Sequence, residues 1–125
     1  MITEDYVSFE VAKLLKEKGF DGIVTNSYDN YTLEFLPHCA KHYGQTNAPT
    51  LQMAMKWLRK KYNIHITGVP NGIGENVFYM GIYKKYDYGW TYISDCLDEE
   101  YKEAEFYTPE EACEAAIKYC LENLI

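Results

Sequence analysis

The sequence predicts an α+β fold in which helices pack on one face of a single layer of mostly antiparallel sheet. Two observations predict it: three stretches place apolar residues at helical spacing behind a helix-start signal, and short alternating runs lie between them. The expected order of elements is α-β-β-α-β-β-β-α. A chain of 125 residues has the size of one domain, so we expect residues 1–125 to form a single globular unit.

The first helix is expected from about Phe9 to Lys18. Ser8 precedes it and is a favourable N-cap, because a serine hydroxyl accepts a hydrogen bond from the first turn. Gly19 follows, as is usual just beyond a helix end. The apolar stripe of this helix contains Val11, Leu14 and Leu15.

Two short strands are expected next, Ile23–Asn26 and Tyr31–Phe35, with a turn at residues 27–30. This turn has the sequence Ser-Tyr-Asp-Asn, and aspartate and asparagine favour turns because their side chains hydrogen-bond to the nearby backbone. The segment Pro37–Asn47 shows neither a helical nor a strand period, so we expect a loop there.

The second helix is expected to begin near residues 48–50, where Pro49 suits the first turn, and to end near Tyr62. Ile64–Thr67 then alternates as a strand does, and the glycine-rich segment 70–74 predicts a turn. The core-facing stripe of the helix contains Leu51, Ala54, Met55, Leu58 and Tyr62.

A β-hairpin is expected from two strands, Val77–Lys85 and Trp90–Ser94, joined by a turn at residues 86–89. Along the first strand, aliphatic side chains alternate with tyrosines, so Met80 and Ile82 point to one side, with Phe78, and the tyrosine rings to the other. If the two strands pair so that their aromatic positions share one face, the face opposite Met80 and Ile82 carries an aromatic panel. This panel contains Tyr79, Tyr83, Trp90 and Tyr92. A slip of one residue would remove this panel.

The last helix has a complete start signal. Thr108 is placed as the N-cap, Pro109 as the first helical residue, and Glu111 as the residue that completes a capping box. Its buried stripe contains Cys113, Ile117, Cys120 and Leu124, beside Ala116 and Leu121. Seven helical positions separate the two cysteines, roughly 10 Å, which is beyond the reach of a disulfide bond.

The net charge of −7 is concentrated at the carboxyl-terminal end. Residues 95–125 contain ten acidic residues and two lysines, whereas the remainder contains nine acidic and ten basic residues. Nucleic-acid binding requires clustered cations, so nucleic acid is not an expected partner. No apolar run is long enough to span a membrane, and residues 1–10 show no secretory signal, so we expect a cytoplasmic protein without a membrane partner.

The sequence shows no catalytic or metal-binding pattern above background. His38, Cys39 and His42 could share one turn, but a zinc site needs further ligands, and a surface loop with incidental histidines is the better interpretation. Gly72 and Gly74 lie between expected strands and not before a helix, which disfavours a phosphate cradle. No nucleophile has an adjacent base. We therefore expect no enzyme activity, metal or cofactor.

The second helix and the hairpin provide a candidate ligand site. Trp57 and Arg59, together with Lys85, could hold an anionic nucleotide-like molecule on which tyrosine rings stack. The other interpretation places Trp57 in the core and the neighbouring cations on a solvated face. We favour this second interpretation, because every surface helix has a polar side.

The aromatic panel has two interpretations, which the sequence leaves open. Tyrosine and tryptophan combine a large apolar body with a polar tip, so the panel fits an exposed surface that docks a protein partner or a second copy of the chain. It also fits amphipathic filling beneath loops or a helix. The first interpretation predicts a non-enzymatic interaction or accessory module whose acidic end helps to select the partner. The alternative function is the binding or sequestering of a small nucleotide-like ligand.

Three segments cover the expected helices: EVAKLLKEKGF (Glu10–Phe20), NAPTLQMAMKWLRKKYNIHI (Asn47–Ile66) and PEEACEAAIKYCLENLI (Pro109–Ile125). They resemble a family of small uncharacterised proteins carried by gut-bacterial phages and other mobile elements. Residues 21–46 and 69–107 look particular to this chain. The resemblance implies a bacterial cytoplasm and an accessory or host-interaction role, and it implies no functional residues.

Overall fold

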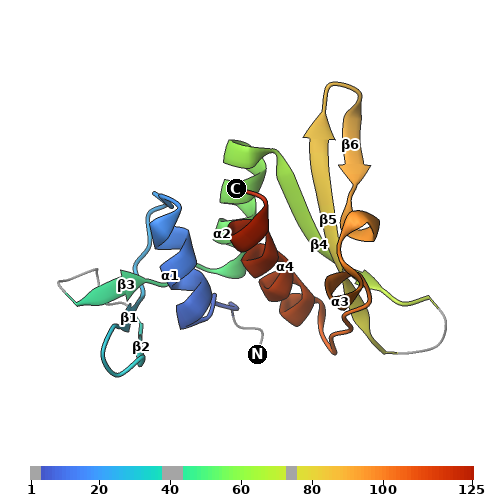
Figure 1. The fold of residues 1–125 in the computed structure, drawn as a ribbon. Helices are drawn as coiled ribbons and strands as arrows, with labels where there is room; N and C mark the ends of the chain where they lie inside the picture. The colour runs from blue at the N-terminus through green and yellow to red at the C-terminus, as the bar shows by residue number, and fades with distance from the viewer. Residues whose placement is uncertain (1–3, 38–43, 73–75) are drawn as a thin grey trace.

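Figure 1 shows the computed structural model of the chain, which describes residues 4–37, 44–72 and 76–125. The elements in chain order are α1 (Phe9–Glu17), β1 (Ser27–Asp29), β2 (Phe35–Leu36), β3 (Gln45–Asn47), α2 (Leu51–Tyr62), β4 (Ile64–Pro70), β5 (Phe78–Tyr86), β6 (Gly89–Tyr92), the short 3₁₀ helix η1 (Ser94–Cys96), α3 (Glu99–Lys102) and α4 (Pro109–Asn123). The expected α+β class with antiparallel strands is confirmed. Among the described residues, no helix is long and apolar enough to cross a membrane.

The three long helices begin where the sequence predicts. The hydroxyls of Ser8, Thr50 and Thr108 accept hydrogen bonds from the third amide of each helix, at 3.3, 3.1 and 3.1 Å. The amino end of each helix therefore has the side-chain cap that its sequence indicates. Asn63 ends α2 in the left-handed region, with φ of 57°, and reverses the chain so that β4 runs back beside α2 (Figure 1).

The strands form two three-stranded sheets, whereas the sequence predicts a single layer. The main sheet has the order β4-β5-β6, and the small sheet has the order β2-β1-β3. The strands of the small sheet have only two or three residues each and pair with one another, and β3 contacts α1. Tyr28 of β1 lies edge-on to Phe9, with ring centroids 5.9 Å apart, and its hydroxyl donates to the Val7 carbonyl at 2.6 Å.

The segment between residues 23 and 47 departs from the expected boundaries. Residues 23–26 form no strand, β1 lies inside the expected turn, and β3 lies inside the expected loop. The turn falls later in the chain because the Asp29 carboxylate accepts hydrogen bonds from the amides of Tyr31 and Thr32, at 2.8 and 3.0 Å. Leu33 then adopts a φ of 63°, and β2 begins only at Phe35.

The core lies between one face of the main sheet and the helices α2 and α4. Ile64, Ile66, Met80 and Ile82 alternate along β4 and β5, face these helices and are at most 4% exposed. α3 lies on the same side, because Tyr101 packs on Tyr119 of α4 with ring centroids 4.7 Å apart. None of the described helices packs on the opposite face of the sheet, which is termed the outer face from here on.

Candidate interaction site on the outer face of the main sheet

The outer face carries a cluster of four rings. The register pairs Tyr83 of β5 with His65 of β4 on one side and with Tyr92 of β6 on the other. The ring centroids of Tyr83 lie 6.0 Å from His65 and 5.0 Å from Tyr92, and those of His65 and Trp90 lie 6.1 Å apart. These four residues, His65, Tyr83, Trp90 and Tyr92, are termed the aromatic face. Here the aromatic side chains lie opposite the buried aliphatic ones, as the alternation predicts.

Tyr79 belongs to the same face of the sheet but lies outside this ring cluster. It pairs with Val69 of β4, and Gly81 separates it from Tyr83 along β5. The Tyr79 hydroxyl accepts a hydrogen bond from Nδ2 of Asn71 at 3.3 Å. The cluster therefore contains three members of the expected panel and one further residue, His65.

The tip of the β5-β6 hairpin carries further exposed rings. Tyr86 and Tyr88 stack with centroids 5.4 Å apart and an interplanar angle of 11°. Trp90 is 46% exposed and Tyr88 is 80% exposed. Large exposed aromatic side chains are stabilised when a partner removes them from water, so their concentration here marks a candidate contact surface.

A pocket of about 360 Å³ opens at one end of the aromatic face and is lined by Arg59, His65, Thr67, Tyr83 and Trp90. Arg59 comes from α2 and reaches the pocket because the chain reverses at Asn63. A guanidinium beside these rings can bind a carboxylate or phosphate while the rings contact an apolar group. The pocket thus brings Arg59, a candidate for ligand binding in the sequence, next to Tyr83 and Trp90, which are candidates for partner binding.

Two pocket residues, His65 and Thr67, are not among the candidates that the sequence suggests. The sequence feature that could have identified them is the alternation of β4. Because Ile64 and Ile66 are buried, His65 and Thr67 lie on the outer face. The same reasoning that selects the tyrosines of β5 would have found His65. It would not have found the nearness of Arg59, which depends on the path of the chain after α2.

Trp57 and Lys85, the other ligand-binding candidates, do not line this pocket. Trp57 is only 9% exposed and packs in the core against Phe20 and Tyr62, with ring centroids 5.6 and 5.3 Å away. Lys85 pairs with Trp90 across the hairpin and points into solvent beside it. Of the three candidates, Arg59 is the one that lines the pocket, and Lys85 is the cross-strand neighbour of Trp90.

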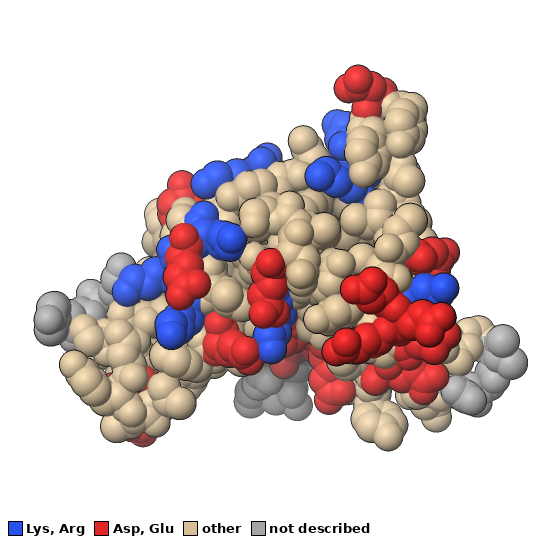
Figure 2. Space-filling model, in the orientation of Figure 1, with Lys and Arg blue, Asp and Glu red and all other residues tan. Residues whose placement is uncertain are grey.

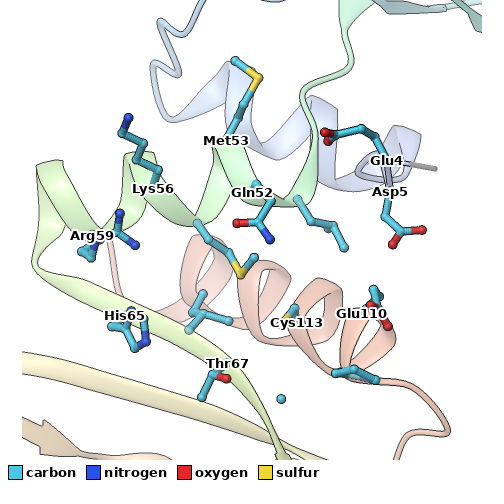
Figure 3. Close-up of a pocket in the computed structure, with 15 residues that line it drawn as sticks. Glu4, Asp5, Gln52, Met53, Lys56, Arg59, His65, Thr67, Glu110 and Cys113 are labelled. Carbon is cyan, nitrogen blue, oxygen red and sulfur yellow. The ribbon is translucent and has the colours of Figure 1, made fainter. Parts of the chain in front are cut away.

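A larger groove of about 760 Å³ adjoins the pocket and shares Arg59, His65 and Thr67 with it. Its walls come from α2, α4, β4 and the segment before α1 (Figure 3). Lys56 and Arg59 lie at one end of this groove, and the carboxylates of Glu4, Asp5 and Glu110 lie at the other. The apolar lining between the two ends contains Leu51, Met55, Ile66, Pro109 and Cys113.

Acidic side chains gather around α3, at the lower right of Figure 2, whereas lysine and arginine lie mainly over other elements in this view. The exposed acids of this region include Asp98, Glu99, Glu100, Glu103 and Glu105. The negative field attracts a partner that carries positive charge beside its contact region, and salt weakens that attraction.

Within the described ranges, no group of three or more histidine, cysteine, aspartate or glutamate residues is placed to hold a metal ion. The candidate set His38, Cys39 and His42 lies outside these ranges. Burial raises the pKa of the Cys120 thiol to about 12, and burial, with a contribution from the negative charge of Glu110, raises the pKa of Cys113. Both thiols are protonated near neutral pH and are poor nucleophiles.

Comparison of the chain with protein-family models, with curated proteins and with solved structures finds no match. The likeness of its helices to small phage-borne proteins therefore stays a prediction of the sequence. A function is inferred from the geometry of the outer face and the chemistry of its side chains.

Proposed function

We propose that this chain is a non-enzymatic interaction module that binds a protein partner through the aromatic face. The observation that supports this function is a cluster of four rings on a sheet face that no described helix covers. Tyrosine, tryptophan and arginine contribute most binding energy at protein interfaces, and Arg59 lies beside the cluster. The resemblance of the helices to phage-borne proteins supports an accessory role in a bacterial cytoplasm.

The shape of the surface favours a protein over a small molecule. Pockets for small molecules bury most of the surface of their ligand. Trp90 is 46% exposed, so a small molecule beside it would stay open to water on one side. A protein partner can instead cover the whole aromatic face, including the exposed part of Trp90.

Replacing Tyr83 and Trp90 together by alanine is expected to weaken partner binding at least about tenfold, because each truncation removes a ring that the partner takes out of water. The partner is first isolated with tagged wild-type protein and identified, and its dissociation constant is then measured with each purified variant. The melting temperature is expected to stay close to that of the wild type, because both rings lie on the outer face.

The matched control replaces Tyr31 and Tyr107 by alanine, since these tyrosines are 85% and 80% exposed and lie outside the aromatic face. This control is expected to bind as the wild type does. Equal affinity for the wild type and the variant without Tyr83 and Trp90 would show that the partner docks elsewhere. Sedimentation over a range of concentrations tests self-association: a dimer that dissociates in this variant alone would identify a second copy as the partner.

The alternative function is the binding of a small nucleotide-like ligand, and one observation favours it. Arg59 lines the same pocket as Tyr83 and Trp90, so one molecule can place an anionic group on the guanidinium and a planar group on the rings. Such a ligand binds only the folded chain and raises its melting temperature by mass action.

Under this alternative, a nucleotide monophosphate is expected to raise the melting temperature and to change the fluorescence of Trp90, whereas the matching nucleoside has a smaller effect. Arg59→Gln is expected to remove the difference between the two compounds, because it removes the cation that holds the phosphate. Trp90→Phe is expected to abolish the fluorescence change, since Trp57 lies in the core. No shift with any nucleotide of a complete set would eliminate the ligand hypothesis.

A further inference from the structure

We propose that the free edge of β4 binds an extended peptide segment as an additional antiparallel strand. The segment lies in the groove between α2 and α4 and carries a basic residue near its amino end and an acidic residue near its carboxyl end. This site goes beyond the proposed function, because it uses a strand edge and not the aromatic face. The two sites border each other at Arg59, His65 and Thr67.

The backbone of β4 offers an unpaired donor and acceptor at Ile66, which lines the groove and is 4% exposed. Ile82 of β5 turns its backbone groups away from β4: its amide donates to Oγ of Ser94 at 2.8 Å, and its carbonyl accepts from the Ile93 amide at 2.8 Å. Ile66 is opposite Ile82 in this antiparallel register, so the Ile66 amide and carbonyl point outward from the sheet. No described residue hydrogen-bonds to them. An open strand edge of this kind pairs readily with an extended chain.

The next residue of β4 whose backbone amide and carbonyl point away from β5 is Gly68. At Gly68, α4 packs against the strand, so the unpaired edge ends there. The Gly68 amide faces the Cys113 thiol of α4, and its interaction with the thiol opposes the rise in the pKa of Cys113. A Cβ atom at Gly68 would lie only 2.8 Å from Cα of Pro109, so α4 and β4 are in close contact there. An added strand therefore pairs with β4 at Ile66, which sets the register of the segment.

The groove also provides a place for the central side chain of that segment. In a sheet, residues opposite each other point to the same face, so the residue that pairs with Ile66 points toward α2 and α4. There it meets the apolar side chains of Leu51, Met55 and Cys113, as Figure 3 shows for the part of the groove around Cys113. A small apolar residue such as valine fits this position. The residues before and after it in the segment point to the solvent-facing outer side of the sheet.

The charges of the groove define the direction of the segment. Its ends lie near the two ends of the groove, one next to Lys56 and Arg59 and the other next to Glu4, Asp5 and Glu110. An antiparallel strand begins near Gly68, at the acidic end of the groove, and finishes near His65, at the basic end. A segment with its basic residue first and its acidic residue last therefore meets an opposite charge at each end.

A second folded copy of the chain does not fit this edge. The edge at Ile66 is recessed between α2 and α4. If another copy approached with its own β4, its α2 and α4 would collide with α2 and α4 of the first copy. An isolated extended segment has no such flanks and can enter the groove.

The probe is a fluorescein-labelled pentapeptide with blocked ends and the sequence lysine-threonine-valine-threonine-aspartate. Its affinity for the full chain is measured by fluorescence polarisation. A control peptide with the lysine and aspartate exchanged has the same composition and is expected to bind at least about tenfold more weakly, because each end then meets a like charge.

Methylation of the valine nitrogen is expected to weaken binding by a similar factor, since it removes the amide that pairs with Ile66. Methylation of the next threonine nitrogen, which points away from β4, is expected to have a smaller effect.

The charge-exchanged variant Lys56→Glu with Asp5→Lys is expected to lose most of the preference between the two peptides, and both positions are exposed, so the fold is retained. The Tyr83→Ala, Trp90→Ala variant is expected to bind the pentapeptide as the wild type does. This result separates the groove from the aromatic face, whose partner binding is measured independently. Equal affinity for the two peptides, equal effects of the two N-methyl groups, or no binding at millimolar peptide would each overturn the proposal. So would loss of peptide binding in the variant without Tyr83 and Trp90.

Discussion

Replacing Ile82 by alanine is expected to lower the free energy of unfolding by about 3 kcal/mol, within the range known for such truncations in protein cores. Ile82 is fully buried at the centre of β5, opposite Ile66 of β4, on the face that α2 and α4 cover. Alanine removes three carbon atoms and leaves a cavity that the surrounding close-packed side chains fill only in part. The change is measured by urea unfolding, where the midpoint falls while the slope stays constant.

Ile23→Ala is the matched control for this substitution, because the same atoms are removed from a side chain that is 91% exposed. Its effect on unfolding is expected to stay within about 0.5 kcal/mol, as is usual at the surface. Equal losses in the two variants would show that the inward face of β5 is not the core. That outcome would also remove the basis for placing Tyr83 on the outer face, since the two positions are neighbours in one alternating strand.

The sequence predicts those parts of the fold in which local physical chemistry decides the structure. Ser8, Thr50 and Thr108 supply hydrogen-bond acceptors to the first turns of their helices, and each does so in the structure. The alternation of β5 separates aliphatic from aromatic side chains regardless of what packs on either face. The part of the aromatic face made by Tyr83, Trp90 and Tyr92 follows from the sequence once β5 and β6 are paired, and His65 joins it through the pairing of β4 with β5.

Other features depend on contacts between distant parts of the chain, and the sequence pattern does not contain them. The turn after β1 is set by the carboxylate of Asp29, and several neighbouring residues have similar turn preferences. β3 has only three residues and pairs with β1 across a long connection, which no local period reveals. The meeting of Arg59 with His65 follows from the reversal at Asn63, whose backbone angles place the end of α2 beside the start of β4.

Ser94 explains how the aromatic face is held in place beyond the last residue of β6. Its hydroxyl accepts the Ile82 amide and donates to the Met80 carbonyl, both at 2.8 Å, and Ser94 is only 4% exposed. A side chain thus satisfies two backbone groups of β5 where the strand ladder of β6 has ended. These bonds fix the chain that leaves β6.

Ser94→Ala is therefore expected to lower the free energy of unfolding by about 2–3 kcal/mol, because it leaves a buried amide and a buried carbonyl without their hydroxyl partner. Urea unfolding measures the total loss. Hydrogen exchange identifies its origin: the Ile82 amide is expected to lose protection by a larger factor than the amides of β5 that pair with β4.

Ser8→Ala provides the comparison, since it also removes one serine hydroxyl but from an exposed helix cap, and about 1 kcal/mol is expected. Binding of the protein partner is expected to weaken in Ser94→Ala and to stay unchanged in Ser8→Ala, because Ser94 anchors the chain directly after Trp90 and Tyr92, whereas Ser8 caps α1. If both variants lost the same stability and exchange at Ile82 were unaffected, Ser94 would not anchor β6. The position of Trp90 and Tyr92 on the outer face would then depend on the hairpin alone.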